Sequence, residues 1–454
     1  MREKQLDQMS IFYTMPGHKV AKELLAISRI VDDNPEALDL IYADLVRDSR
    51  TDTGRVGMTA EQVLRSTILK QYRTMTYDEL SFHLDDSLAF RTFARLNPTQ
   101  SLGGSTLQEN IKSVSVGTWE EIHNIFVRHA MSKDLEKGRK VRLDSTTVDT
   151  DIHYPLDSLL LQDGVRIITR WLIEGKRLRP VPVYVFTDHR RVMKKRVMKI
   201  RNNRSKKVRK EAYRDLLHYA GRVRGYAIDA MEVLYAFVSE HVEDVHRARV
   251  LAEKLQRAVM ILDRVIDQTE RRVIHGEKVP ASEKVVSFFE DHTDIIVKDN
   301  RETRFGHKVF LAGGASGMIL DCVIERGNPA DSDIFPLMIK RQKRIYGRVP
   351  RQVAADGGFA SVDNLLNAKK DGVKDVCFSK KRGLSVQDMV KSNWVYKRLR
   401  NFRAGIEANI SVLKRSYGLY RCNWKGWAGF QKYVWSSVVS YNLLVMARLT
   451  LASA

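Results

Sequence analysis

The alternation of strand-like and helical segments in residues 294–380 constrains the fold more than any other feature of the chain. Three strand-like runs come first, and Gly313, Gly314 and Gly317 mark a hairpin-like turn between the second and third. The pattern then gives a helix, with Pro336 in its first turn, and afterwards a strand, a helix and a strand. This order predicts a mixed sheet with helices on its faces, and therefore an α/β domain.

Residues 58–115 read as four short helical segments. Thr76 is a good N-cap for the second, and Glu79 completes a capping box three residues later. Ser105 or Thr106 is expected to cap the last. Short helices joined by tight turns are typical of helix-turn-helix DNA-binding units, and also of small helical bundles, so this segment leaves both interpretations open.

Residues 188–272 have two apolar stripes at helical spacing, which predict an antiparallel hairpin of long helices. The region opens with the basic run 191–210, which holds eleven Lys and Arg in twenty residues, with positive charges on every face. Asn202, Asn203 and Ser205 are expected to break the helix midway. A solvated helix face and a contact with the DNA backbone explain the run equally well. The candidate DNA contacts are Lys194, Lys195, Arg196, Lys206 and Lys207.

The net charge of +22 predicts that the protein binds a polyanion. A membrane is not expected, because no run of about 20 apolar residues is free of charge; residues 434–454 are predicted to form a buried amphipathic helix. The N-terminal segment lacks the apolar core of a secretory signal. Three scattered cysteines argue against a disulfide framework or a cysteine zinc site, so a cytoplasmic location is expected.

Three acidic residues stand where acids are locally unexpected. Asp144 interrupts a strand-forming run at 139–150, and Asp356 ends a strand at a Gly-Gly turn. Glu407 lies on a helix with Arg403 four residues before it and Lys414 seven residues after it. Three carboxylates from distant positions are enough protein ligands for Mg²⁺, which keeps several waters, and two such ions suit phosphodiester transfer.

Each of these acids also has a common structural explanation. An Asp before Gly-Gly is usually a turn residue, and a Glu between basic residues on a helix is usually part of a surface ion pair. Asp149, Asp151 and Asp157 compete with Asp144 for the first position. Neither a phosphate-binding Gly-rich loop nor a serine nucleophile elbow is found.

Several segments together carry a resemblance that covers nearly all of the chain. They are MTAEQVLRSTILKQYRTMTYDELSFHL, LDSTTVDTDIHYPLDS, FGHKVFLAGGASGMILDCVIERGNPADS, VAADGGFAS and NFRAGIEANISVLKRSYG. The chain resembles bacterial insertion-sequence transposases of the DDE class. The resemblance implies an RNase H-like catalytic domain in which Asp144, Asp356 and Glu407 are the catalytic acids and the metal ligands.

The family's helix pattern around the glutamate is Tyr-x₂-Arg-x₃-Glu-x₆-Lys. Arg403, Glu407 and Lys414 match it, whereas Arg400 stands at the tyrosine position. Arg403 and Lys414, with the adjacent Arg415, are expected to hold DNA phosphates.

The resemblance also implies the cofactor and the partners. Two Mg²⁺ ions, with Mn²⁺ able to replace them, would support hydrolysis at the element's terminal inverted repeats and attack of the freed 3′-OH on target DNA. A homodimer or higher synaptic oligomer, associated with the nucleoid, is expected. Two alternatives stay open: a domesticated transposase that regulates by binding DNA, and a site-specific nuclease without strand transfer.

The expected architecture is a mixed-sheet RNase H-like domain with an all-α N-terminal DNA-binding region and a helical insertion. The two aspartates are 212 positions apart, and only 51 separate Asp356 from Glu407, which places the insertion after the first strand. The expected divisions are an N-terminal helical arm (1–57), a helix-turn-helix-type region (58–135), the first part of the catalytic domain (136–187), a helical hairpin insertion (188–285), and the rest of the catalytic domain with the C-terminal helices (286–454).

Overall fold

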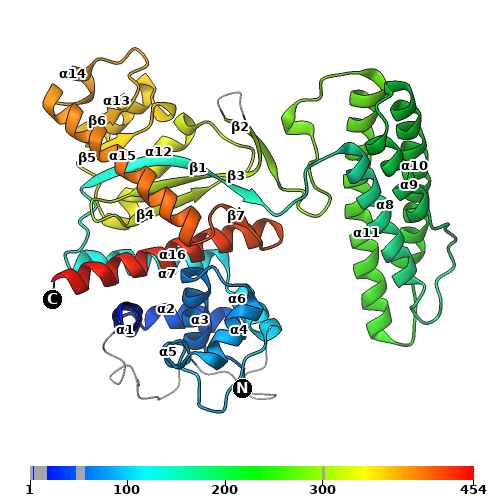
Figure 1. Ribbon diagram of the computed structural model, residues 1–454, viewed down its shortest axis with the longest axis horizontal. Coiled ribbons are helices and arrows are strands. Elements are labelled where there is room, and N and C mark those ends of the chain that lie inside the picture. The colour runs from blue at the N-terminus through cyan, green and yellow to red at the C-terminus, as the bar shows by residue number, and fades with distance from the viewer. Residues whose placement is uncertain (1–3, 5–17, 48–56, 299–301, 454) are drawn as a thin grey trace. The chain divides into compact units, whose positions relative to one another are not determined.

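The computed structural model describes residues 4, 18–47, 57–298 and 302–453, which fall into two compact units (Figure 1). Unit 1 comprises the chain up to Asp149 and from His307 onward, and unit 2 comprises Thr150–Gly306. Each unit buries its own apolar core. Within the expected N-terminal arm, residues 1–3, 5–17 and 48–56 lie outside the described residues.

The sheet is mixed, as the sequence predicts. Its order is β2-β3-β1-β5-β6, with β4 paired to β3 and β7 to β1. Strands β1, β5 and β6 are parallel neighbours, whereas β3 pairs antiparallel with β2 and β4. A left-handed Gly317, with φ of 89°, lies in the β3–β4 turn. The strands are β1 (Lys140–Thr150), β2 (Asp294–Lys298), β3 (Glu302–Gly313), β4 (Ile319–Ile324), β5 (Gln352–Ala355), β6 (Asp375–Phe378) and β7 (Arg421–Cys422).

Helices pack against this sheet in unit 1, and α15 runs across β5 and β6 (Figure 1). They are α12 (Asp331–Tyr346), α13 (Val362–Lys370), the short α14 (Val386–Met389) and α15 (Asn393–Ser416). The expectation that Pro336 sits in the first turn of its helix is wrong, because α12 already begins at Asp331. Proline lacks the N–H that would bond the carbonyl of Ser332, and that carbonyl instead accepts a 2.8 Å hydrogen bond from Asn364.

The C-terminal helix α16 (Gly426–Ser453) is buried, as predicted, but it is not amphipathic. It packs against α1 (Lys19–Asp32), α3 (Ala60–Tyr72) and α7 (Val116–Ser132), so side chains on nearly every face are buried. Because other helices cover it on several sides, little of its surface faces water and few polar side chains are required. Among the described residues it is the one helix long and apolar enough to cross a membrane, and 72% of its most apolar window is buried within the protein.

The N-terminal helices pack together around α3, whose residues 60–71 are all buried. The capping box predicted at Thr76 and Glu79 is confirmed at the start of α4. Gly103, rather than Ser105 or Thr106, caps α6, because the helix begins at Gly104, where an added Cβ would meet the carboxylate of Asp78. The remaining helices here are α2 (Glu36–Val46), α4 (Tyr77–Asp86), α5 (Leu88–Phe93) and α6 (Gly104–Ser113).

Unit 2 is a helical bundle in which α10 and α11 pack along each other as the predicted hairpin. The bundle also includes α8, which packs on both, so the helical unit starts well before residue 188. The break expected in the basic run is present between α9 and α10, where the Asn203 side chain accepts a hydrogen bond from the Ser205 N–H. Its helices are α8 (Asp157–Gly175), α9 (Arg190–Asn202), α10 (Lys206–Tyr235) and α11 (Val242–Thr269), followed by a π-helical turn (Glu270–His275) and a 3₁₀ turn (Ala281–Glu283).

Helix α9 does have one apolar face, contrary to the expectation that positive charges fall on every side. Met193, Val197 and Ile200 are buried in the unit 2 core, at helical spacing. The cations of α9 therefore lie on the remaining, solvent-facing part of the helix, where Lys194 and Lys195 are exposed.

Asn442 on α16 is expected to stabilise unit 1 through two hydrogen bonds to the backbone of β4. Its side-chain oxygen accepts from the backbone N–H of Ile319 at 2.8 Å, its amide donates to the Ile319 carbonyl at 2.6 Å, and it is 1% exposed. Asn442→Ala should lower the free energy of unfolding by about 1–3 kcal/mol, because the buried Ile319 N–H loses its acceptor, while the Ile319 carbonyl keeps its contact with His123. Chemical denaturation measures this. Asn401→Ala, at an exposed position of α15, should change it by less than about 0.5 kcal/mol; equal effects would contradict the prediction.

Candidate active site

The parallel pairing of β1 with β5 brings the two aspartates to the same end of adjacent strands. Leu143 is the register partner of Ala355. Asp144 is the next residue of β1, and Asp356 directly follows β5. Because adjacent strands lie about 4.8 Å apart, this register places two carboxylates side by side although 212 positions separate them in the sequence.

Helix α15 adds a third carboxylate and a cation. Arg403 and Glu407 are one turn apart, and their side chains form an ion pair of 2.8 Å. The other terminal nitrogen of Arg403, Nη2, lies 3.3 Å from Asp144 Oδ2 and 3.2 Å from Asp356 Oδ1. One guanidinium thus contacts all three carboxylates that the sequence analysis selected.

Arg142 fixes α15 over β1. Its guanidinium donates to the side-chain oxygen of Asn409 at 2.6 Å and to the backbone carbonyl of Phe402 at 3.3 Å, and it stacks on the Phe402 ring. The close approach requires glycine at 405, because an added Cβ would overlap Arg142 Nη1. Arg142 was not predicted as a site residue, although it lies two residues before Asp144 on the same face of the strand.

Asp356 is held by groups from the end of β6. Ala355 pairs with Phe378, so the next residue, Ser379, lies beside Asp356 and donates a 2.8 Å hydrogen bond to its Oδ1. Lys380 packs against Gly357, where an added Cβ would meet its side chain. Neither residue was selected from the sequence, although parallel register places the end of β6 next to the end of β5.

The two aspartates have opposite electrostatic environments. Burial raises the pKa of Asp144 to about 6, and Asp356 and Glu407 act in the same direction, against Arg403 and the Ser145 N–H. Burial would also raise the pKa of Asp356. Hydrogen bonds from Ser379 and the Gly357 backbone, together with the charges of Arg403 and Lys380, outweigh burial and hold that pKa below its usual value.

A fourth carboxylate, that of Asp331, adjoins the site. Asp331 accepts a 3.2 Å hydrogen bond from the side chain of Ser145, next to Asp144, and forms a 3.0 Å ion pair with Lys308. An added Cβ at Gly358 would meet its carboxylate, so Asp331 also packs against the turn after Asp356. Asp331 therefore contacts both the strand residue after Asp144 and the turn after Asp356.

The other predicted residues lie apart from the convergence at Arg403. Lys414, partly buried, and Arg415, exposed, lie about two turns beyond Glu407 on α15, and Arg400 is exposed. Of the competing acids, Asp157 belongs to unit 2, where Arg272 binds it. Asp149 and Asp151 follow at the end of β1 and just beyond it. In unit 2, Arg196 pairs with Asp215, and Lys194, Lys195, Lys206 and Lys207 are exposed.

The donor set suits a hard divalent cation, because every ligand candidate is a carboxylate oxygen. Arg403 holds its positive charge where these oxygens converge. Across the described parts of the chain, no three acidic, histidine or cysteine side chains already stand in an arrangement that could hold a metal ion. The chemical type of these residues and their closeness to one another therefore fit a metal site. The Arg403 guanidinium has to move away before the three carboxylates can bind an ion together.

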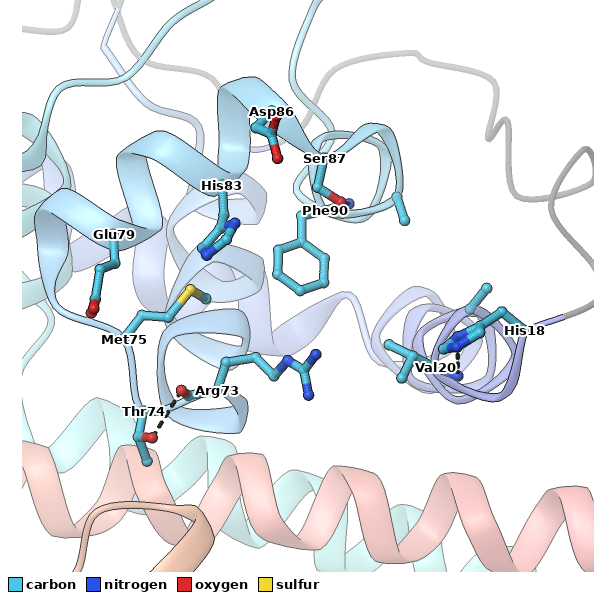
Figure 2. Close-up of a pocket in the computed structure, with 12 residues that line it drawn as sticks. His18, Val20, Arg73, Thr74, Met75, Glu79, His83, Asp86, Ser87 and Phe90 are labelled. Atoms are coloured by element: carbon cyan, nitrogen blue, oxygen red, sulfur yellow. Dashed lines mark hydrogen bonds between the residues drawn. The ribbon is translucent and has the colours of Figure 1, made fainter.

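A separate pocket of about 760 Å³ lies among α1, α4, α5 and the turn after α3. Figure 2 shows Arg73 extending into it between Phe90 and His18, with Glu79 and Asp86 on α4. With Arg73 opposed by Glu79 and Asp86, the lining has no net positive charge that would attract a DNA backbone.

One comparison with known proteins gives a family. Residues 264–443 match the model of the family described as Transposase DDE domain. This part of the chain carries a transposase DDE domain. The match includes Asp356, Arg403 and Glu407 and begins after Asp144. Neither the curated proteins nor the solved structures gave a significant match.

The transposase DDE family implies an RNase H-like fold, DNA binding and DNA transposition, and its members generally use divalent metals. The strand order and the acidic cluster described above are consistent with this assignment. Asp144 lies outside the matched residues, and the structure joins it to the matched part through the β1–β5 pairing and Arg403.

The Arg142–Gly405 contact predicts that a Gly→Ala change within a helix lowers the free energy of unfolding, where it would usually raise it. Alanine normally stabilises a helix interior by about 0.5–1 kcal/mol relative to glycine. Gly405→Ala should instead lower the free energy of unfolding of unit 1 by about 1–3 kcal/mol, because the new methyl overlaps a buried, hydrogen-bonded guanidinium. Denaturant titration provides the measurement.

Gly117→Ala is the matched control, since Gly117 lies in α7 of the same unit with open space around its Cβ position. It should leave stability unchanged or raise it. Stabilisation by Gly405→Ala would show that α15 is not held against Arg142.

Proposed function

We propose that this protein is a DNA transposase that cuts the ends of its element and joins the freed 3′-OH to target DNA. Asp144, Asp356 and Glu407 would hold two Mg²⁺ ions, which Mn²⁺ can replace. The observation that carries the proposal is the convergence of these three carboxylates on Arg403, with two of them inside the matched DDE domain.

The chain's own groups have distinct parts in this reaction. Bound divalent cations would supply an activated water or 3′-OH and stabilise the leaving oxygen. Asp144, with a side chain 14% exposed, forms the enclosed side of the site, and Glu407, 62% exposed, forms the open side from which DNA enters. Arg403 compensates the three carboxylates in the free protein, and its planar fork can turn to a DNA phosphate when cations replace it. Lys414 and Arg415, farther along α15, would extend the phosphate contacts.

DNA recognition is assigned to the N-terminal helices, and α6 is the best candidate for contact with base edges. Helix α3 is buried, so it has no free surface for DNA. The exposed positions of α4 include Asp78, Glu79, Asp85 and Asp86, which would repel phosphates. Helix α6 exposes Thr106 and Gln108 and a single acid, Glu109. We further propose that the protein works as a dimer or higher synaptic oligomer, in the cytoplasm at the nucleoid.

Removing any of the three acids should abolish cleavage and leave DNA binding intact. Asp144→Asn, Asp356→Asn and Glu407→Gln should each lower the rate of strand cleavage in Mg²⁺ by more than about 100-fold, since even residues that only support metal ligands cost 10–100-fold. Affinity, measured by fluorescence anisotropy, should not fall, because it comes mainly from cations on phosphates. Chelation should stop cleavage, and Mg²⁺ or Mn²⁺ should restore it.

Asp363→Asn, at an exposed position of α13, is the control and should cleave normally. Cleavage by Asp144→Asn would move the first ligand to Asp149 or Asp151. Cleavage by the unaltered protein without joined products would identify a nuclease instead of a transposase.

Gln108 on α6 should contribute to sequence preference. In the full-length protein, Gln108→Ala should lower the ratio of affinity for the element's terminal DNA to affinity for random duplex by about tenfold, because one bidentate base contact is worth about 1–3 kcal/mol. Gln387→Ala, on the exposed face of α14, should leave this ratio unchanged. Competition binding with both duplexes measures it. An unaltered ratio in Gln108→Ala would mean that α6 does not read the bases.

A further inference from the structure

A cavity of about 440 Å³ in unit 2 has a strongly positive lining. It lies where three segments meet: the start of α8, the first two turns of α10, and the π-helical turn after α11. Lys206, Arg209 and Lys210 line it from α10, and Arg272 lines it from the opposite segment. Pro155 and Leu156 contribute apolar wall.

The single carboxylate in the lining is already fully engaged. Asp157 is 7% exposed, and both of its oxygens contact Arg272, at 2.9 and 3.0 Å. Gln268 donates a further 2.9 Å hydrogen bond to it. Arg272 and Asp157 therefore neutralise each other. Burial lowers the pKa of the neighbouring Lys284, and repulsion from Arg272 acts in the same direction.

The three cations of α10 have no such compensation. Among the described residues, Lys206, Arg209 and Lys210 form no ion pair, and they occupy successive positions of one helical face around a single cavity. Like charges gathered in this way repel each other unless an anion lies between them. The lining thus has a positive excess without an acidic partner in its own unit.

The excess of positive charge continues along the chain into α9. Met193, Val197 and Ile200 turn one face of α9 into the core, so Lys194, Lys195 and Lys199 face solvent on the segment that leads to the cavity. An isolated small anion would satisfy the cavity alone. A polyanion with regularly spaced charges would satisfy both the cavity and α9, and duplex DNA carries one negative charge per about 1.7 Å of its axis.

We propose that this cavity binds a backbone phosphate of DNA, with Lys206, Arg209 and Lys210 as its main ligands. The proposal rests on the proposed function only in that DNA is the partner, and it adds a defined phosphate site in unit 2. The site contacts no base, so it anchors DNA of any sequence. Arg272 is held in place by Asp157 and closes the far wall.

The test uses the full-length protein and a random-sequence duplex in metal-free buffer, so that it is independent of catalysis. The triple variant Lys206→Gln, Arg209→Gln, Lys210→Gln should bind more weakly. The slope of log affinity against log salt concentration should become shallower by about one, as expected if one phosphate loses its contacts. Fluorescence anisotropy at several salt concentrations gives the slope.

A matched control removes the same charge elsewhere in unit 2. The variant Arg170→Gln, Arg214→Gln, Lys254→Gln changes three exposed residues that do not line the cavity, and its slope should stay that of the unaltered protein. The charge-preserving variant Lys206→Arg, Arg209→Lys, Lys210→Arg should also keep the slope, which separates loss of charge from loss of fold.

Equal slopes for the cavity variant and the control would overturn the proposal. A cavity variant with an unaltered slope but a changed oligomeric state in light scattering would also overturn it, and would assign the cavity to an acidic surface of a second copy. If the acid variants still cleaved DNA while the cavity variant lost salt dependence, the proposed catalytic site would fail and the phosphate site would stand.

Discussion

The buried guanidinium of Arg142 joins strand β1 to helix α15, and the geometry of the candidate active site depends on this link. Its two acceptors, the Phe402 carbonyl and the Asn409 side chain, bracket Arg403 and Glu407 along the helix. Apolar contacts alone would allow α15 to slide or rotate on the sheet, whereas hydrogen bonds are directional. A rotation by one residue turns a side chain by about 100°, which would carry Glu407 away from the aspartates. Gly405 makes the close approach possible.

The second constraint is electrostatic, because the fold gathers three carboxylates that repel one another. Arg403 compensates them together, and the environments of the two aspartates then diverge. Asp144 lies inside the strand with few donors, so burial raises its pKa, whereas the donors at the ends of β5 and β6 hold the pKa of Asp356 down. An incoming divalent cation would stabilise the ionised form of Asp144 most, since that carboxyl has the most to gain from a nearby positive charge. In the free protein the three carboxylates therefore lie close together without forming a metal-binding arrangement.

Local sequence patterns predicted much of this fold. The Thr76–Glu79 capping box, the Asn203 break and the strands at both aspartates need only neighbouring residues, and the structure has all of them. Features that depend on distant packing were missed. Helix α16 has no polar face because three helices cover it, and α6 begins at Gly104, where Asp78 leaves no room for a side chain. Arg142 and Ser379 were missed since their partners are supplied by strand register and helix docking, which no local pattern reports.

Because each unit has its own core, the acids of the candidate active site and the cations of the helical bundle belong to separately packed parts of the chain. The acids of unit 1 are assembled from segments on both sides of unit 2, yet they pack on a core that includes no residue of the helical bundle. The bundle is held by its own apolar stripes, so the exposed cations of α9 and α10 take no part in its core. Within the bundle, Arg190 and Arg196 are neutralised by Asp188 and Asp215, and Arg272 by Asp157. Among the described residues, the three cavity cations of α10 form no such ion pair. The exposed lysines of α9 and the three cations of α10 at the cavity thus keep an unrelieved positive charge, as expected of a surface that is complete only with a polyanion bound.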